Sequence, residues 1–220
     1  MTNRTKALIT TAGLALLATG GPAQAAPPTA HQLSIAAKPT RVVYGAKSAI
    51  TGKLTGADAA GETIDLNADP FPFDTFVKVA TTHTNTAGAY GFFVTPTENT
   101  KYRTDAKSKA PASSPELLVR VAPKVTLKVS DKTPAENQKV TFSGTVTPEH
   151  DGQAVLLQRR KSGGGWKTVK TGVLVDAGTA PSTYVFKRKI TRGGTYRVVK
   201  PADADHVQGR SPKRKLTLSS

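Results

Sequence analysis

Apolar and polar residues alternate along most of the chain beyond Ala26, and Gly, Pro, Asn or Asp interrupts the alternation about every 8 to 12 residues. Successive side chains of a β-strand point to opposite faces, so one phase can line an interior while the other meets water. The apolar phase in one such segment is Val140, Phe142 and Val146. No amphipathic helical pattern is evident. The sequence therefore predicts an all-β sandwich built of short strands.

The order of landmarks in this strand pattern occurs twice. T-G-K-L at residues 51–54 matches S-G-T-V at 143–146, and T-K-Y-R at 100–103 matches G-T-Y-R at 194–197. Corresponding positions lie about 91 to 97 residues apart. We infer a duplicated unit of about seven strands, with one domain at 26–122 and a second at 123–220. The short join around Pro123 predicts limited hinge freedom between them.

The first 25 residues have the features of a secretory signal peptide. Arg4 and Lys6 supply positive charge, residues 7–18 are mostly apolar, and Ala23-Gln24-Ala25 offers small residues at a cleavage site. No later stretch approaches the roughly 20 apolar residues that a membrane-spanning helix needs. We therefore expect residues 1–25 to be removed, no transmembrane segment, and a secreted, extracellular protein that is a candidate for association with the cell wall.

The sequence contains no arrangement of residues that predicts an enzyme. There is no cysteine, and the four histidines lie far apart in the sequence, outside any known catalytic or nucleotide-binding motif. Lys170-Thr171-Gly172 matches one β-lactamase motif, but its S-x-x-K partner does not occur in the chain. We predict a protein that is not an enzyme and that needs no cofactor.

One acidic loop could hold a cation. Asp203, Asp205 and His206 stand close together before the last strand. They offer two or three ligands, whereas calcium takes six or more oxygens. The sequence thus favours an ordinary polar loop, and no metal site is predicted.

The strand motifs resemble a known family of domains. V-T-F-S-G-T-V-T-P at 140–148, G-Q-A-V-L-L-Q-R-R at 152–160 and T-Y-R-V at 195–198 are similar to the bacterial immunoglobulin-like domains of secreted and cell-wall proteins of actinobacteria. The resemblance covers residues 33–219. It implies two tandem immunoglobulin-like β-sandwiches with fibronectin-III-like topology, in which Tyr102 and Tyr196 are tyrosine corners. It also implies a spacer or adhesion function.

Positive charge is concentrated in the second domain. Residues 123–220 contain 19 Lys and Arg against 7 Asp and Glu, a net charge of +12, whereas residues 26–122 contain 10 against 8, a net charge of +2. Strand phase predicts that four of the cations project from one outer sheet face: Arg160, Arg197, Lys213 and Lys215.

Two interpretations of this charge stay open. A basic face attracts polyanions through steering and counterion release, and candidate partners outside a cell are an anionic cell-wall polymer, a glycan or a lipid head group. The other interpretation is that the charge only keeps the protein soluble. Sequence-specific nucleic acid binding is not expected, because no recognition helix is present and no aromatic residues interleave with the basic runs.

A second candidate contact is the loop Asp69-Pro70-Phe71-Pro72-Phe73-Asp74. Phe71 and Phe73 could present a preformed apolar contact to a protein partner, or fold back onto the sandwich. The sequence thus predicts a secreted, non-enzymatic binding or adhesion module that uses its basic second domain. The alternative is a structural spacer or accessory protein that binds a protein partner through Phe71 and Phe73. The sequence does not define an oligomeric state.

Overall fold

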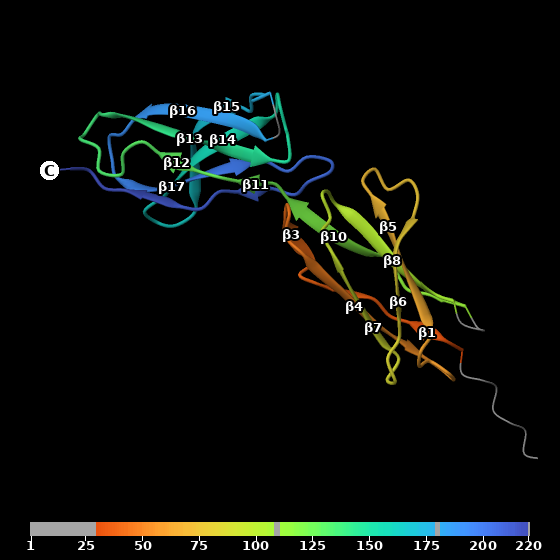
Figure 1. Cartoon of the computed structure of the whole chain (residues 1–220). Coiled ribbons are helices and arrows are strands. Elements are labelled where there is room, and N and C mark those ends of the chain that lie inside the picture. The colour runs from red at the N-terminus through yellow and green to blue at the C-terminus, as the bar shows by residue number, and fades with distance from the viewer. Residues whose placement is uncertain (1–29, 108–110, 179–180, 220) are drawn as a thin grey trace, which may run out of the picture.

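The computed structural model describes residues 30–107, 111–178 and 181–219, and the predicted signal peptide lies outside this part of the chain. All regular structure within it is β-strand, arranged in two sandwiches that follow one another along the chain (Figure 1). Among the described residues, no helix is long and apolar enough to cross a membrane. The prediction of an all-β fold with two tandem immunoglobulin-like sandwiches is confirmed.

The N-terminal sandwich comprises strands β1 to β10. One sheet has the order β1-β4-β2, with β7 also paired to β4, and the other has the order β3-β10-β8-β5-β6, with β9 paired to β8. The strands are β1 (Gln32–Leu33), β2 (Ala36–Lys38), β3 (Arg41–Val43), β4 (Ser48–Thr55), β5 (Thr63–Pro70), β6 (Val77–His83), β7 (Ala89–Val94), β8 (Thr100–Ala106), β9 (Ala112–Ser113) and β10 (Leu117–Ala122).

The C-terminal sandwich comprises strands β11 to β19. Its first sheet has the order β11-β13-β12 with β16 paired to β13, and its second has the order β15-β14-β17-β18 with β19 paired to β17. This is the fibronectin-III-like arrangement that the sequence predicted. The strands are β11 (Lys124–Val125), β12 (Lys128–Val129), β13 (Lys139–Thr147), β14 (Ala154–Arg160), β15 (Trp166–Val173), β16 (Ser182–Lys189), β17 (Gly194–Lys200), β18 (Gly209–Arg210) and β19 (Arg214–Leu216).

The alternation in the sequence produces the core directly. In β13 the side chains of Val140, Phe142 and Val146 are fully buried, whereas Thr141 and Thr145 between them are partly exposed. The three buried side chains pack with apolar residues from both sheets into one cluster that fills the C-terminal sandwich. The N-terminal sandwich has two smaller clusters, one around Leu66 and Val121 and one around Leu54 and Ile64. Apolar burial of this kind stabilises each sandwich without any disulfide.

Strand β3 was not predicted. It pairs in parallel with β10, so that Val42 lies opposite Val121, and it closes the edge of the second N-terminal sheet. With only three residues, β3 is too short to produce an alternation that distinguishes it from a loop. The first two strands of the C-terminal sandwich, β11 and β12, pair with β13 as β1 and β2 pair with β4.

The junction between the sandwiches is held by hydrogen bonds as well as by the chain. The loop between β17 and β18 lies against the N-terminal sandwich, where Val207 N donates to Val121 O at 2.8 Å and Asn99 N donates to Asp205 O at 2.8 Å. The guanidinium of Arg41 donates to the main-chain oxygen of Gln208 at 2.6 Å. These contacts restrain the junction beyond what a short linker does alone.

The two predicted tyrosine corners differ in detail. The hydroxyl of Tyr196 lies 3.5 Å from the main-chain oxygen of Arg192, the expected partner but a long hydrogen bond. The hydroxyl of Tyr102 contacts the side chain of Thr100. Stronger hydroxyl contacts come from Tyr90 and Tyr184, which the sequence analysis did not single out.

Candidate polyanion-binding face

The outer face of the sheet formed by β15, β14, β17 and β19 carries the predicted basic residues. In β14 and β17, Leu157 and Tyr196 point into the core, so the opposite phase of each strand, which includes Arg160 and Arg197, points outward. In β19, Lys215 lies opposite Thr195 of β17, again in the outward phase, and Lys213 precedes this strand by one residue. We refer to Arg160, Arg197, Lys213 and Lys215 as the basic face.

An aromatic residue lies within this face. The guanidinium carbon of Arg197 sits 3.9 Å from the ring centroid of Trp166, and Arg197 Nε donates to Gln158 Oε1 at 2.9 Å. Trp166 is paired with Arg160 across β14 and β15. The basic runs contain no aromatic residue in the sequence, but strand pairing brings Trp166 next to Arg197 in space.

Other cations surround Arg197. Burial against Trp166 and its neighbours lowers the pKa of the Arg197 guanidinium, and the positive charge of Arg210 lowers it further. Arg210 lies opposite Val199, two residues along β17 from Arg197. A guanidinium that is stacked and hydrogen-bonded in one orientation loses little conformational entropy when it binds an anion.

The corresponding face of the N-terminal sandwich provides an internal comparison. There, the guanidinium of Arg103 lies 4.7 Å from the ring centroid of Phe76, which repeats the stack of Arg197 on Trp166. Arg103 Nε, however, forms an ion pair with Asp105 at 3.3 Å, and Lys101 forms one with Glu116 at 3.1 Å. The N-terminal face is thus neutralised by its own carboxylates.

These carboxylates have no acidic counterparts in the C-terminal face. The repeat aligns Asp105 with Val199 and Glu116 with Lys213. Among the described residues of the C-terminal sandwich, Lys200 is the only Lys or Arg with a carboxylate oxygen within 4.0 Å. The positive charge of the basic face is therefore available to a partner. At the matching positions of the N-terminal sandwich, carboxylates neutralise it.

A groove extends this surface around the edge of the sheet. The apolar residues that line it include Val43, Leu127 and Pro212. Its cationic lining, which sequence analysis missed, comprises Lys124, Lys128, Arg210 and Arg214. The four residues are spread over 91 positions and meet because β11 lies beside β18 and because Arg214 Nε of β19 donates to Leu127 O, just before β12.

The second predicted contact, the loop that contains Phe71 and Phe73, is ordered by the sandwich. The two rings contact each other edge to face with centroids 5.7 Å apart, and the ammonium of Lys101 lies 5.3 Å from the Phe73 centroid. Both side chains are half-buried. More strongly exposed apolar side chains occur elsewhere in this sandwich, at Phe93 and Val77.

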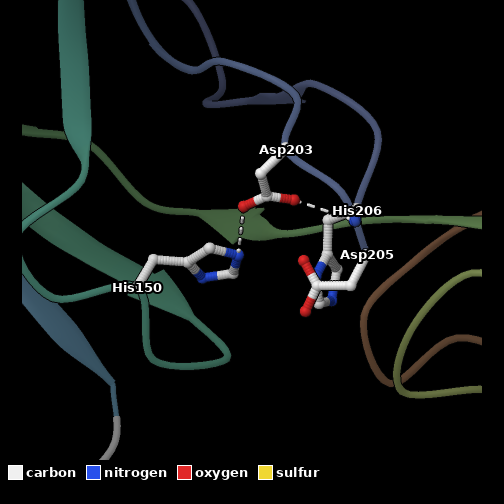
Figure 2. Close-up of side chains that lie close together, drawn as sticks. All are labelled: His150, Asp203, Asp205 and His206. Atoms are coloured by element: carbon white, nitrogen blue, oxygen red, sulfur yellow. Dashed lines mark hydrogen bonds and ion pairs between the residues drawn. The ribbon is translucent and has the colours of Figure 1, made fainter. Parts of the chain in front are cut away.

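Two of the four histidines, distant in sequence, meet in space. The rings of His150 and His206 lie 4.9 Å apart between centroids, next to Asp203 and Asp205 at the junction of the sandwiches (Figure 2). The sequence predicted an ordinary polar loop at Asp203, Asp205 and His206, and no pattern in it connects His150 with that loop. This cluster is separate from the basic face.

Fold and surface together define a tandem immunoglobulin-like β-sandwich protein whose C-terminal sandwich carries unneutralised positive charge. No family model matches the chain, and no curated protein matches it. Among solved structures it is similar to a tetra-tandem repeat in the extending region of a large adhesion protein, with 16% identity, 85% of this chain and 49% of that chain covered, and a TM-score of 0.38. It is also similar to the D0-D1 domain of intimin, with 13% identity, coverage of 86% and 98%, and a TM-score of 0.30. The chain spans about half the length of the adhesion-protein repeat.

Proposed function

We propose that this protein is a secreted, non-enzymatic adhesion-type module that associates with an anionic polymer of the cell envelope or the extracellular space through the basic face. The observation that carries the proposal is the contrast between two equivalent faces. Arg103 and Lys101 are paired with carboxylates in the N-terminal sandwich, whereas Arg197 and Lys213 lack them in the C-terminal one. A charge that served only solubility would not require this difference between matching positions.

The chemistry of the face favours a repeated anion. The basic face lies on adjacent strands, and the groove lined by Lys124, Lys128, Arg210 and Arg214 continues it. A polymer with regularly spaced phosphate or carboxylate groups can contact several of these cations at once and release counterions as it binds. The indole of Trp166 adds an apolar surface beside the charges, which suits the sugar rings of an anionic glycan.

The test is binding of the tag-free protein, residues 26–220, to immobilised heparin and to isolated cell walls over a range of salt concentrations. We expect salt-sensitive retention. A variant with Arg160, Arg197, Lys213 and Lys215 all changed to Gln should bind heparin about 10-fold or more weakly, with a shallower dependence on salt.

A matched variant separates a specific face from net charge. Lys132, Lys139, Lys187 and Lys189 are exposed, and the last three lie on the opposite sheet of the same sandwich. Changing these four to Gln removes the same number of charges and should leave binding nearly unchanged. Equal losses in the two variants would mean that the protein responds to total charge alone, and the proposal would be rejected.

The alternative, a spacer or accessory protein that contacts a protein partner through Phe71 and Phe73, stays a prediction. Because the two rings pack against each other and beside Lys101, their exposed surface is reduced. We therefore favour the basic face.

A further inference from the structure

Two loops of the C-terminal sandwich bring four potential metal ligands together next to the N-terminal sandwich. His150 lies in the loop between β13 and β14, and Asp203, Asp205 and His206 lie in the loop between β17 and β18 (Figure 2). Each of the four residues offers one ligand atom that lies within 4.8 Å of the other three. The closest pairs are His150 Nε2 with Asp203 Oδ2 at 3.3 Å and His206 Nδ1 with Asp205 Oδ1 at 3.1 Å.

In each imidazole, the ring nitrogen that points away from the carboxylates forms a hydrogen bond with the main chain. His150 Nδ1 lies 2.8 Å from the main-chain oxygen of Pro148, and His206 Nε2 lies 2.9 Å from that of Thr97. A carbonyl oxygen can only accept, so these nitrogens carry the N–H in each ring. This is the arrangement seen in metal-binding histidines, where a hydrogen bond to the second nitrogen fixes the tautomer and the ring orientation.

The inner nitrogen of each neutral imidazole then carries a lone pair. His150 Nε2 and His206 Nδ1 are buried and have no hydrogen-bond partner, and both side chains are only 3% exposed. Each lone pair faces a carboxylate oxygen, which is also an acceptor. Such a contact is unfavourable unless a cation lies between the two atoms.

One cation can serve both contacts, because the four ligand atoms all lie within 4.8 Å of one another. The protonation states that bind a metal are a neutral imidazole and an ionised carboxylate.

The ligand set favours zinc over calcium or magnesium. Two imidazole nitrogens and two carboxylate oxygens suit a tetrahedral Zn²⁺, whereas calcium and magnesium prefer six or more ligands that are mainly oxygens. Zinc bonds of about 2.0 to 2.1 Å place neighbouring ligand atoms about 3.3 Å apart. The two closest pairs already have this spacing, and the other pairs, which lie within 4.8 Å, have to close by at most about 1.5 Å.

Other contacts position the ligands. Asp203 Oδ2 accepts a hydrogen bond from the buried ammonium of Lys200 at 2.6 Å, and its Oδ1 accepts one from His206 N at 2.9 Å. The main-chain N–H of His150 donates to Ser182 Oγ at 2.7 Å. The ammonium reduces the negative charge of the cluster, and its hydrogen bond fixes the orientation of the Asp203 carboxylate.

We propose that His150, Asp203, Asp205 and His206 bind one divalent ion of the zinc class and that this ion stabilises the junction between the two sandwiches. The link to the junction is direct. His206 contacts Thr97 through its other ring nitrogen, and the main-chain oxygen of Asp205 accepts from Asn99 N, so both ligands also hold the N-terminal sandwich. The proposal is independent of the basic face.

The experiment uses tag-free protein, residues 26–220, freed of metal with a chelator and titrated with Zn²⁺ by calorimetry. We expect one tightly bound ion, and Co²⁺ at the same site should show the strong visible absorption of tetrahedral coordination. Ca²⁺ and Mg²⁺ should not compete. Absence of Zn²⁺ binding, or equally tight binding of Ca²⁺, would overturn the proposal.

Variants locate the site. Asp205→Asn removes a half-exposed ligand without disturbing the core and should weaken Zn²⁺ binding by at least about 10-fold. His150→Gln should abolish tight binding, provided that its circular dichroism matches the wild type. The control is Asp176→Asn, in the neighbouring cluster of Glu149, Asp151 and Asp176, which should bind Zn²⁺ normally. If Asp176→Asn lost Zn²⁺ binding and Asp205→Asn retained it, the ion would belong to the cluster of Glu149, Asp151 and Asp176, and the proposed site would be refuted.

Hydrogen exchange tests the effect on the junction. The amides of Val207 and Asn99 donate across it, to Val121 O and Asp205 O. Zn²⁺ should slow their exchange in the wild type and in Asp176→Asn, but not in Asp205→Asn. Binding of Zn²⁺ with unchanged exchange at both amides would refute the stabilising role.

Discussion

Tyr184 lies directly opposite Gly144 on the neighbouring strand, and its hydroxyl passes over that glycine to donate a hydrogen bond to the main-chain oxygen of Thr126. The N-terminal sandwich repeats the arrangement, with Tyr90 opposite Gly52 and its hydroxyl bonded to Ser34 O. In each sandwich, a tyrosine hydroxyl thus hydrogen-bonds the segment between the first two strands to the sheet. The glycine opposite the tyrosine leaves room for its ring and hydroxyl.

Replacing the glycine should strongly destabilise the C-terminal sandwich. A Cβ at Gly144 would lie 2.3 Å from Thr126 O and 2.6 Å from the Tyr184 hydroxyl. Since the first contact is with main chain, which cannot rotate away, we expect Gly144→Ala to lower the free energy of unfolding by ~3 kcal/mol. Trp166 is the only tryptophan, so its fluorescence during urea unfolding reports on this sandwich.

Gly163→Ala is the matched control for this substitution. Nothing lies within 4 Å of a Cβ at Gly163 in its exposed turn. Its unfolding free energy should stay within about 0.5 kcal/mol of the wild type. Similar urea midpoints for the two alanine variants would contradict the role assigned to Gly144.

Removing the Tyr184 hydroxyl should have a smaller, measurable effect. Tyr184→Phe keeps the ring in the core but leaves Thr126 O without this donor, and we expect a loss of ~1 kcal/mol. Tyr196→Phe removes a hydroxyl whose contact with Arg192 O is 3.5 Å long, so it should cost less than half as much. A larger loss in Tyr196→Phe would restore the tyrosine corner as the main hydroxyl contact. The same fluorescence assay measures both variants.

The sequence predicted what depends on local pattern. The alternation of Val140, Phe142 and Val146 determines which side of β13 is buried, and the repeated Tyr-Arg pair at 102–103 and 196–197 identifies corresponding strands of the two sandwiches. These features follow from the two-residue period within one strand, so they can be predicted without knowing which strand it pairs with. Likewise, the outward phase of Arg160 and Arg197 follows from the apolar residues beside them.

Contacts that depend on register or on loop conformation could not be predicted in this way. Trp166 reaches Arg197 only because β15 and β17 both pair with β14, and the pairing of β14 with β15 shifts register after Leu157. His150 and His206 are 56 residues apart in loops without periodicity. A sequence pattern carries no information on how far such loops extend, so the cluster became visible only in three dimensions.

Ionisation of a buried phenol should reduce stability at high pH. Burial raises the pKa of Tyr102 to about 12, although a hydrogen bond with Thr100 opposes the shift, whereas an unfolded tyrosine ionises near pH 10. The stability that this group contributes is therefore complete below pH 10 and is lost as the pH rises through about 12. The difference in phenolate absorbance between wild type and Tyr102→Phe should give the Tyr102 titration directly. A midpoint near 10 in the folded protein would contradict this prediction.

A charge reversal in the N-terminal sandwich should create a second basic face there. Glu116 is the ion-pair partner of Lys101 and aligns with Lys213, so Glu116→Lys would free one cation and add another beside Arg103. We expect this variant to elute from heparin at higher salt than the wild type, because its N-terminal face then resembles the C-terminal one. Glu136→Lys makes the same change of charge at an exposed site away from either face and should elute close to the wild type. If both variants shift equally, binding depends on net charge and the pairing of carboxylates on the N-terminal face has no functional meaning.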